Sequence, residues 1–297
     1  MYKEIAIIAP TASGKTQLSI NLANKLNAVI LSLDSLSVYK QIDIASAKPT
    51  KEEQNGIVHF GIDKVLPNEK FDVVEFIEEY QNAKQYALNN NKNLIIVGGT
   101  GFYLKSMIEG LSKVPKISEN TKEIVKNELN NLKKSYEYLM SIDKKYMSNI
   151  SINDKYRVEK AYEIYIETKT IPSKFFEQNK PEPIIKNIDI FEIQTDVEVL
   201  RERIKIRTNK MLLDGIIDEV IYLEKRYSRE LNCMSSIGIV ETLDYLDGKF
   251  DKKRLVELIS THTSQLAKRQ RTFNNSQFQN IYKDKLENLE NKIISSF

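Results

Sequence analysis

The sequence has 297 residues and is nearly balanced in charge, with 44 Lys and Arg against 41 Asp and Glu and a formal net charge of +3. Its single cysteine, Cys233, and its two histidines, His59 and His262, exclude a disulfide framework and a structural zinc site. No apolar run approaches the roughly 18 residues of a membrane span, and the short apolar start excludes a signal peptide. We therefore expect a cytoplasmic protein without a membrane partner.

The first hundred residues alternate between apolar runs and helical patterns. Apolar runs predict strands over residues 3–8, 28–33 and 93–97. Helical patterns follow over 16–26 and 75–89. Strands that alternate with helices, and that are apolar throughout, predict an α/β fold: a parallel sheet with helices on both faces.

The pattern changes after Pro115. Residues 118 to about 168 are helical throughout, rich in Lys, Glu, Asn and Tyr, and Ser118 is a plausible helix start. A strand over 188–194 and one long helix over 196–226 then resume the first pattern. We therefore predict a P-loop kinase-like core made of residues 1–114 and 188–297, the latter ending in a helical segment, with a helical insert over 115–187.

A phosphate-binding loop follows the first predicted strand. Its residues are Ala9, Pro10, Thr11, Ala12, Ser13, Gly14, Lys15 and Thr16. They fit the P-loop pattern G-x-x-x-x-G-K-[ST], except that Ala9 replaces the first Gly, which is tolerable if its φ is negative. Backbone N–H groups would surround an anion at a helix N-terminus, Lys15 would add charge, and Thr16 could bind Mg²⁺. The loop indicates phosphate or diphosphate without specifying ATP; a chance Gly-Lys-Thr before a helix is the alternative.

Two further polar positions follow predicted strands. Asp34 ends the second strand, and Thr100 lies in the Gly98–Gly101 turn after the third. Ligands of open α/β sheets bind at these carboxyl ends, so Asp34 could act as a base or an Mg²⁺ partner and Thr100 could offer its hydroxyl. A helix N-cap at Asp34 and a plain turn at Thr100 are the structural alternatives.

Basic residues cluster in two places. Arg203 and Arg207 share a face of a predicted helix and could close over a phosphate. Residues 267–271, Ala-Lys-Arg-Gln-Arg, could contact nucleic-acid phosphates. In both cases a solvated charged face is the alternative.

These residues, taken in order, resemble the tRNA dimethylallyltransferases. The matching positions are Pro10 to Thr16, Asp34-Ser35, Tyr39, Ala47-Lys48-Pro49, Gly98 to Gly101, Tyr103, Glu109 to Leu111, Asn153-Asp154, Arg157, Ala161, Glu163, Arg203, Arg207, Met211, Gly215, Glu219-Val220, Ile237-Gly238, Glu241, Gly248, Ala267 to Gln270 and Thr272. The resemblance covers most of the chain. The chain departs from it at Ala9, Ser37, Lys122, Ile239 and Phe273-Asn274.

The resemblance implies transfer of a dimethylallyl group from dimethylallyl diphosphate to N6 of adenosine 37 in tRNAs that read codons beginning with U, with Mg²⁺ as cofactor. It implies a catalytic role for Asp34 and Thr100, a diphosphate site made of residues 9–16 and Arg207, and a metal contact at Thr16. The tRNA-binding residues would be Asp34, Ser35, Leu36, Ser37, Lys122, Arg157, Lys268, Arg269, Gln270 and Arg271. We expect a monomer that binds the anticodon stem-loop, partly through the insert.

Two other functions fit parts of the sequence. A small-molecule or nucleotide kinase would share the P-loop and use ATP as donor, but would not need the C-terminal segment around Ala267 to Thr272. A non-catalytic RNA-binding protein would not need Lys15, Thr16, Asp34 and Thr100 intact.

Overall fold

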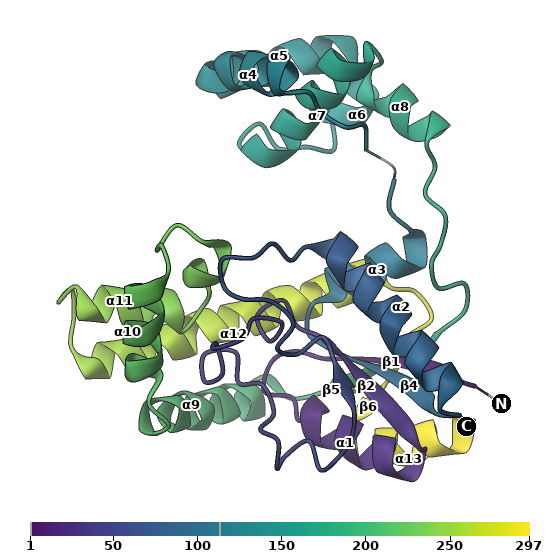
Figure 1. The fold of residues 1–297 in the computed structure, drawn as a ribbon, viewed down its shortest axis with the longest axis vertical. Helices are drawn as coiled ribbons and strands as arrows, with labels where there is room; N and C mark the ends of the chain where they lie inside the picture. The colour runs from purple at the N-terminus through teal and green to yellow at the C-terminus, as the bar shows by residue number, and fades with distance from the viewer. Residues whose placement is uncertain (1, 113) are drawn as a thin grey trace. The chain divides into compact units, whose positions relative to one another are not determined.

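The computed structural model describes residues 2–112 and 114–297. The chain forms two compact units, one made of Met1–Met107 with Ile185–Phe297 and the other of Ile108–Ile184 (Figure 1). The sequence-based limits of the insert, 115 and 187, fall a few residues later along the chain than these. Each unit has its own apolar core.

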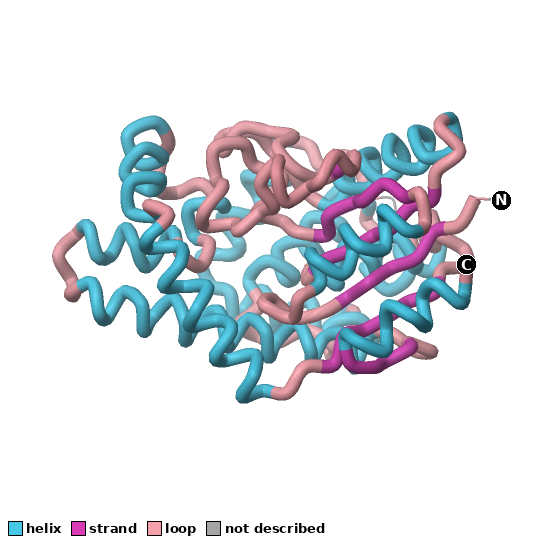
Figure 2. The backbone as a smooth tube through the Cα atoms, turned by 90° about the horizontal axis from the view of Figure 1, so that it is seen from below, coloured by secondary structure: helices cyan, strands magenta, loops and turns pink. Residues whose placement is uncertain are grey.

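The first unit contains a six-stranded parallel sheet (Figure 2). The strands are β1 (Glu4–Ile8), β2 (Ala28–Leu33), β3 (His59–Phe60), β4 (Asn93–Gly98), β5 (Asp189–Gln194) and β6 (Tyr282–Lys285), in the order β3-β2-β4-β1-β5-β6. The predicted α/β parallel sheet is therefore confirmed. Two edge strands escaped prediction, because β3 has only two residues and β6 is polar and mostly exposed.

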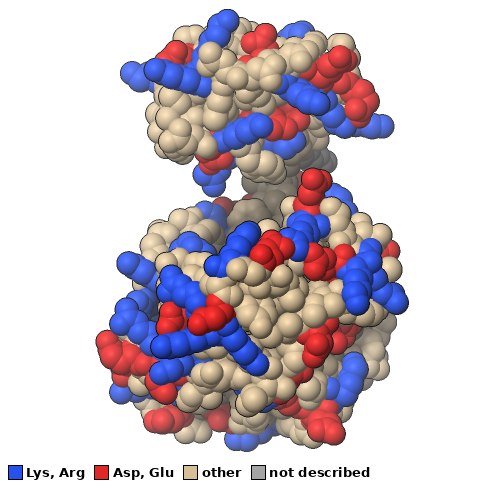
Figure 3. All heavy atoms as spheres, turned by 90° about the vertical axis from the view of Figure 1, so that its left-hand side faces the viewer, with Lys and Arg blue, Asp and Glu red and all other residues tan. Residues whose placement is uncertain are grey.

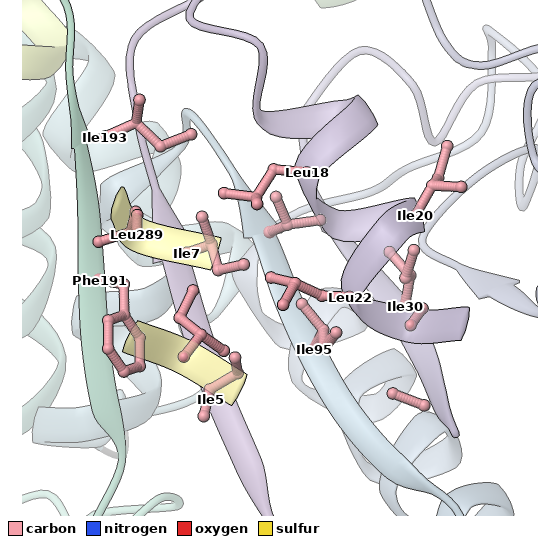
Figure 4. Close-up of a cluster of buried hydrophobic side chains, with 14 of the residues drawn as sticks. Ile5, Ile7, Leu18, Ile20, Leu22, Ile30, Ile95, Phe191, Ile193 and Leu289 are labelled. Atoms are coloured by element: carbon pink, nitrogen blue, oxygen red, sulfur yellow. The ribbon is translucent and has the colours of Figure 1, made fainter. Parts of the chain in front are cut away.

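Helices cover both faces of this sheet (Figure 1). On one face lie α1 (Lys15–Lys25) and α13 (Leu286–Ser296), which contact each other; α2 (Val73–Asn89) packs on β2 and β4 from the other. Figure 4 shows Ile5 and Ile7 of β1 packed between Leu18 and Leu22 of α1 and Leu289 of α13. This packing holds α1 against β1 and so positions the loop that joins them.

A group of helices extends the first unit beyond the sheet. They are α9 (Val197–Leu213), α10 (Ile216–Arg226), α11 (Ile239–Leu246) and α12 (Lys252–Gln277), with a short 3-10 helix, η2 (Asn232–Ser235). Helix α3 (Gly101–Glu109) follows β4 and lies beside α2, where Tyr103 stacks on Phe76. The single helix predicted over 196–226 is wrong, because Gly215 adopts φ 97° and separates α9 from α10. Residues that carry a side chain rarely adopt this φ, whereas glycine does so readily. The turn lets Val220 and Leu223 of α10 join a second apolar core.

The second unit, over its described residues, is helical as predicted. It contains α4 (Glu119–Glu128), η1 (Leu129–Asn131), α5 (Leu132–Ile142), α6 (Lys144–Met147), α7 (Lys155–Thr168) and α8 (Pro172–Gln178). Ser118 caps α4, since its hydroxyl accepts a hydrogen bond from the Thr121 N–H. Val125, Leu139 and Val158 are fully buried and form the centre of its core.

The described surface carries charges of both signs. On the face drawn in Figure 3, Lys and Arg side chains lie among Asp and Glu, as the near-equal totals of 44 and 41 lead one to expect. Among residues 2–112 and 114–297, no helix is both long and apolar enough to cross a membrane.

Candidate active site

The P-loop joins the end of β1 to the start of α1. Gly14 precedes the helix with φ 91°, and Ala12 also lies in the left-handed region, with φ 66°. Ala9 is fully buried and its φ is not positive, so the alanine fits this position without strain. The first N–H groups of α1 have no intrahelical partner, and the Ser13 hydroxyl is buried without a hydrogen bond within the described chain. The loop is therefore built to receive an anion.

Four charged side chains from three parts of the chain meet at this loop. Lys15 belongs to α1, Arg203 and Arg207 to α9, and Asp34 follows β2. The Arg203 guanidinium donates a hydrogen bond at 3.3 Å to the Ser13 carbonyl. Burial and the nearby Arg207 lower the pKa of Lys15 to about 8, while Asp34 opposes the shift. Burial also lowers the pKa of Arg207, and Asp34 again opposes it. Two partly desolvated cations beside one carboxylate favour binding of an additional anion.

Asp34 holds the turn after β2. Its Oδ1 accepts hydrogen bonds from the backbone N–H groups of Leu36 at 2.8 Å and Ser37 at 3.2 Å. The helix N-cap considered as an alternative is wrong, because a turn and no helix follows Asp34, and its carboxylate caps this turn instead. Within the described residues Oδ2 makes no hydrogen bond. Asp34 can thus maintain the turn with one oxygen and accept a proton with the other.

Two adjoining cavities flank Asp34, and both are lined by Thr11, Asp34 and Arg207. The first, which we name the Asp34 cavity, has a volume of about 290 Å³, near the lower end of the range for small-molecule sites. Its remaining wall residues include Ser35, Leu36, Ala45, Ser46, Thr100, Thr208, Met211, Ser236, Ile237, Thr263, Leu266 and Gln270. The second, the P-loop cavity, also contains Lys15, Thr16, Ser37, Ala47, Lys48, Pro49 and His59.

Helix α12 packs on both the P-loop and the Gly98–Gly101 turn. The Gln270 carboxamide oxygen accepts a hydrogen bond at 3.0 Å from the Thr11 backbone N–H. A Cβ on Gly99 would lie 2.3 Å from Gln270 Nε2, and one on Gly101 would lie 2.8 Å from Asn274 Oδ1. A side chain at either glycine would therefore have to displace the end of Gln270 or of Asn274. Gln270 thus contacts the P-loop, whereas its role toward tRNA stays a prediction.

The predicted residues of the Asp34-Ser35-Leu36-Ser37 segment face two cavities. Ser35 and Leu36 line the Asp34 cavity, while Ser37 is 4% exposed and lines the P-loop cavity. Thr100 also lines the Asp34 cavity and joins the turn considered as an alternative, since its N–H donates to Leu33 and its carbonyl accepts from Tyr103. The structure therefore brings Asp34, Thr100, Lys15 and Arg207 together.

The other predicted tRNA-binding residues do not line these two cavities. Lys268 and Arg269 are exposed on α12, with Arg271 partly exposed beside them. In the second unit, Lys122 pairs with Glu119 at 2.6 Å and Arg157 with Asp154 at 3.0 Å. These ion pairs are exposed and therefore weak, so they leave both cations available.

One residue of the site had no role predicted from the sequence. The Glu219 carboxylate of α10 accepts three backbone hydrogen bonds, from Asp43 at 2.8 Å, Ile44 at 2.7 Å and Ala45 at 2.9 Å. These residues begin the segment whose Ala47, Lys48 and Pro49 line the P-loop cavity. The resemblance already included Glu219-Val220, but the sequence could not show that Glu219 binds the backbone at Asp43, Ile44 and Ala45.

The oxygen groups near the P-loop fit an Mg²⁺ ion held largely by a bound diphosphate. Thr16 is exposed and lines the P-loop cavity together with Asp34. No group of three or more His, Cys, Asp or Glu that could hold a metal occurs within residues 2–112 and 114–297. Mg²⁺ commonly keeps several waters and takes only one or two protein ligands beside substrate phosphates.

The chain matches known proteins in sequence and in fold. The model of the family described as IPP transferase matches residues 37–277. A protein of Sulfurovum sp. named tRNA dimethylallyltransferase is 54% identical over 289 residues, which cover 97% of this chain and 96% of that protein. One of the same name from Aliarcobacter butzleri is 55% identical over 295 residues, 99% of each chain. The chain belongs to the IPP transferase family.

Solved structures of IPP transferase relatives share the fold. A eukaryotic dimethylallyltransferase acting on tRNA superposes with a TM-score of 0.83 at 28% identity, over 96% of this chain and 74% of that one. The full-length tRNA isopentenylpyrophosphate transferase of Bacillus halodurans gives a TM-score of 0.73 at 28% identity, over 99% and 96%. The predicted P-loop kinase-like fold and the resemblance to tRNA dimethylallyltransferases are thus confirmed.

Proposed function

We propose that this protein transfers a dimethylallyl group from dimethylallyl diphosphate to a tRNA. The observation that carries the proposal is the meeting of Asp34, Lys15 and Arg207 at one point between two cavities. A diphosphate in the P-loop cavity would place its hydrocarbon toward the Asp34 cavity, where a base could enter from the other side. Relatives about 55% identical carry the name tRNA dimethylallyltransferase, which supports this assignment.

The reaction forms one bond and breaks another. The N6 amine of adenosine 37 attacks C1 of the dimethylallyl group, the C1–O bond breaks, and its electron pair leaves with the diphosphate. The N6 proton passes to Asp34 Oδ2, which has no other partner within the described residues. The adenine amine is a weak nucleophile because its lone pair is delocalised into the ring, so removal of its proton assists the attack.

The P-loop stabilises the charge that develops on the leaving group. Lys15, Arg207 and the N–H groups of the loop already surround the position of that charge and need little rearrangement during the reaction. Thr100 offers a hydroxyl in the Asp34 cavity that can orient the base. Thr16 would hold Mg²⁺ beside the diphosphate, where the ion would supply further charge neutralisation.

The tRNA is the second substrate of the proposed reaction. Adenosine 37, in tRNAs that read codons beginning with U, must leave the anticodon-loop stack, which costs a few kcal/mol. Lys122 and Arg157 in the second unit and Lys268, Arg269 and Arg271 on α12 would contact the anticodon stem-loop and offset this cost. All the groups that we assign to the reaction belong to one chain, so we propose that the protein acts as a monomer, and that it does so in the cytoplasm.

The proposal is tested by mass spectrometry of an anticodon stem-loop RNA. The RNA is incubated with the protein, Mg²⁺ and dimethylallyl diphosphate, and then digested to nucleosides. We expect an adenosine that carries one dimethylallyl group in place of a hydrogen, at position 37 only. An RNA with another base at position 37 is the control. Consumption of ATP with no change in the RNA would support a kinase instead and contradict the proposal.

A further inference from the structure

A large groove, separate from the two cavities at Asp34, lies between α9 and α12, and these helices pack against each other (Figure 1). Its volume is about 740 Å³. Arg201 and Lys205 line it from α9, and Lys268 and Arg271 line it from α12. Leu200 and Ile204 are buried at the contact between the two helices and form its apolar floor.

The charge of this groove is strongly one-sided. Its one acidic side chain, Glu257, pairs at 3.0 Å with Arg254, which lies outside the groove. No ion pair or hydrogen bond within the described residues engages the side chains of the four cations that line it. A groove with four unpaired cations favours an anionic partner of several charges.

The groove lies close to the proposed active site. Ile204 lines both this groove and the Asp34 cavity. On α12, Gln270 reaches the P-loop, whereas Lys268 and Arg271 line the groove. The two sites therefore share a wall made by α9 and α12. An RNA whose base enters the Asp34 cavity would carry its backbone phosphates close to this wall.

We propose that the α9–α12 groove binds the phosphodiester backbone of the RNA substrate, with Arg201 and Lys205 as contacts alongside Lys268 and Arg271. This inference rests on the proposed function. Residues four apart on a helix are separated by about 6 Å along its axis, so Arg201 and Lys205 can each meet a different phosphate. Such contacts strengthen binding without reading the base sequence.

The test measures how salt affects RNA affinity. The probe is a fluorescently labelled anticodon stem-loop RNA, and its anisotropy is followed with the full-length protein at several salt concentrations. The variant is Arg201→Gln/Lys205→Gln, and a second variant is Lys268→Gln/Arg271→Gln. The matched control is Lys252→Gln/Lys253→Gln, which removes two exposed lysines from the start of α12, outside the groove. Melting temperatures establish that each variant is folded.

We expect each groove variant to bind the RNA more weakly. The slope of log K against log salt should shrink by about 0.7–0.9 for each phosphate that the variant no longer neutralises, and the control should keep the wild-type slope. An unchanged slope in Arg201→Gln/Lys205→Gln, or an equal change in the control, would overturn the inference. An unchanged slope is also the result expected if the groove held a small anion instead of RNA. Dimethylallyl transfer by the wild-type protein, measured separately, tests the proposed function alone.

Discussion

The side chain of Gln270 accepts a hydrogen bond at 3.0 Å from the backbone N–H of Thr11, which joins α12 to the P-loop across most of the chain. The same side chain lies against Gly99, where any Cβ would collide with it. One residue of α12 thus contacts both loops that border the Asp34 cavity.

Gln270→Met tests this connection, because methionine has a similar shape but cannot accept the hydrogen bond from Thr11. The loss should lower the free energy of unfolding by about 0.5–1.5 kcal/mol and raise the KM for dimethylallyl diphosphate by up to about tenfold. Steady-state kinetics and thermal unfolding measure both. Thr272→Val, an exposed change on the same helix, is the control. An unchanged KM would show that the P-loop keeps its shape without Gln270.

Lys15→Ala removes the lysine charge nearest the proposed diphosphate. Transfer should fall by orders of magnitude while RNA affinity changes little, since the RNA contacts lie elsewhere. Single-turnover kinetics and RNA anisotropy on the same preparation provide the comparison. Lys25→Ala, at the exposed end of α1, should leave both unchanged. Equal loss of transfer and RNA binding in a folded Lys15 variant would mean that the loop is not the donor site.

Asp34→Asn separates the catalytic role of Asp34 from its structural one. Asparagine keeps an oxygen that can accept from Leu36 and Ser37, so the turn should persist, but it cannot take the N6 proton. We expect kcat to fall by roughly 10²–10⁴-fold with diphosphate affinity nearly intact. Asp34→Ala should in addition lower the melting temperature. A wild-type kcat in Asp34→Asn would mean that Asp34 only stabilises the turn and is not the base.

The pKa of Lys15 predicts a pH dependence of diphosphate binding. Burial and Arg207 lower this pKa to about 8, so the side chain is an ammonium below this pH and becomes neutral above it. The affinity for inorganic diphosphate, measured by calorimetry, should therefore decrease as the pH rises above about 8. The Lys15→Arg variant keeps a positive charge at this position over the whole range. Its pH profile therefore shows the effect of titrating the ligand alone. Parallel pH profiles for the two proteins would contradict the assignment.

Glu219→Gln tests how the segment after Asp43 is held. A carboxamide presents an NH₂ group to backbone N–H donors, so at least one of the three hydrogen bonds should be lost. We expect a lower melting temperature and a higher KM for dimethylallyl diphosphate, with a smaller effect on kcat. Asp218→Asn, which changes an exposed neighbour on α10, is the control. If KM and melting temperature match those of the control, Glu219 does not position this segment.

The sequence alone determined the P-loop, the parallel sheet and the helical character of the second unit. These features depend on neighbouring residues: consecutive backbone N–H groups make the anion site, and continuous apolar runs make β1, β2 and β4. The sequence shows a glycine at position 215, but helical patterning on both sides of it favoured one continuous helix. The polar edge strand β6 carried no apolar signal.

The tertiary structure decided which distant residues meet. Arg207 lies beside Lys15, Gln270 bonds to Thr11, and Glu219 holds the segment after Asp43, although each pair is separated by more than 170 positions. Such pairs depend on how α9, α10 and α12 pack against one another and against the loops that follow the strands. Local sequence patterns do not encode this packing. The α9–α12 groove arises in the same way, because its cations become neighbours only when the two helices lie side by side.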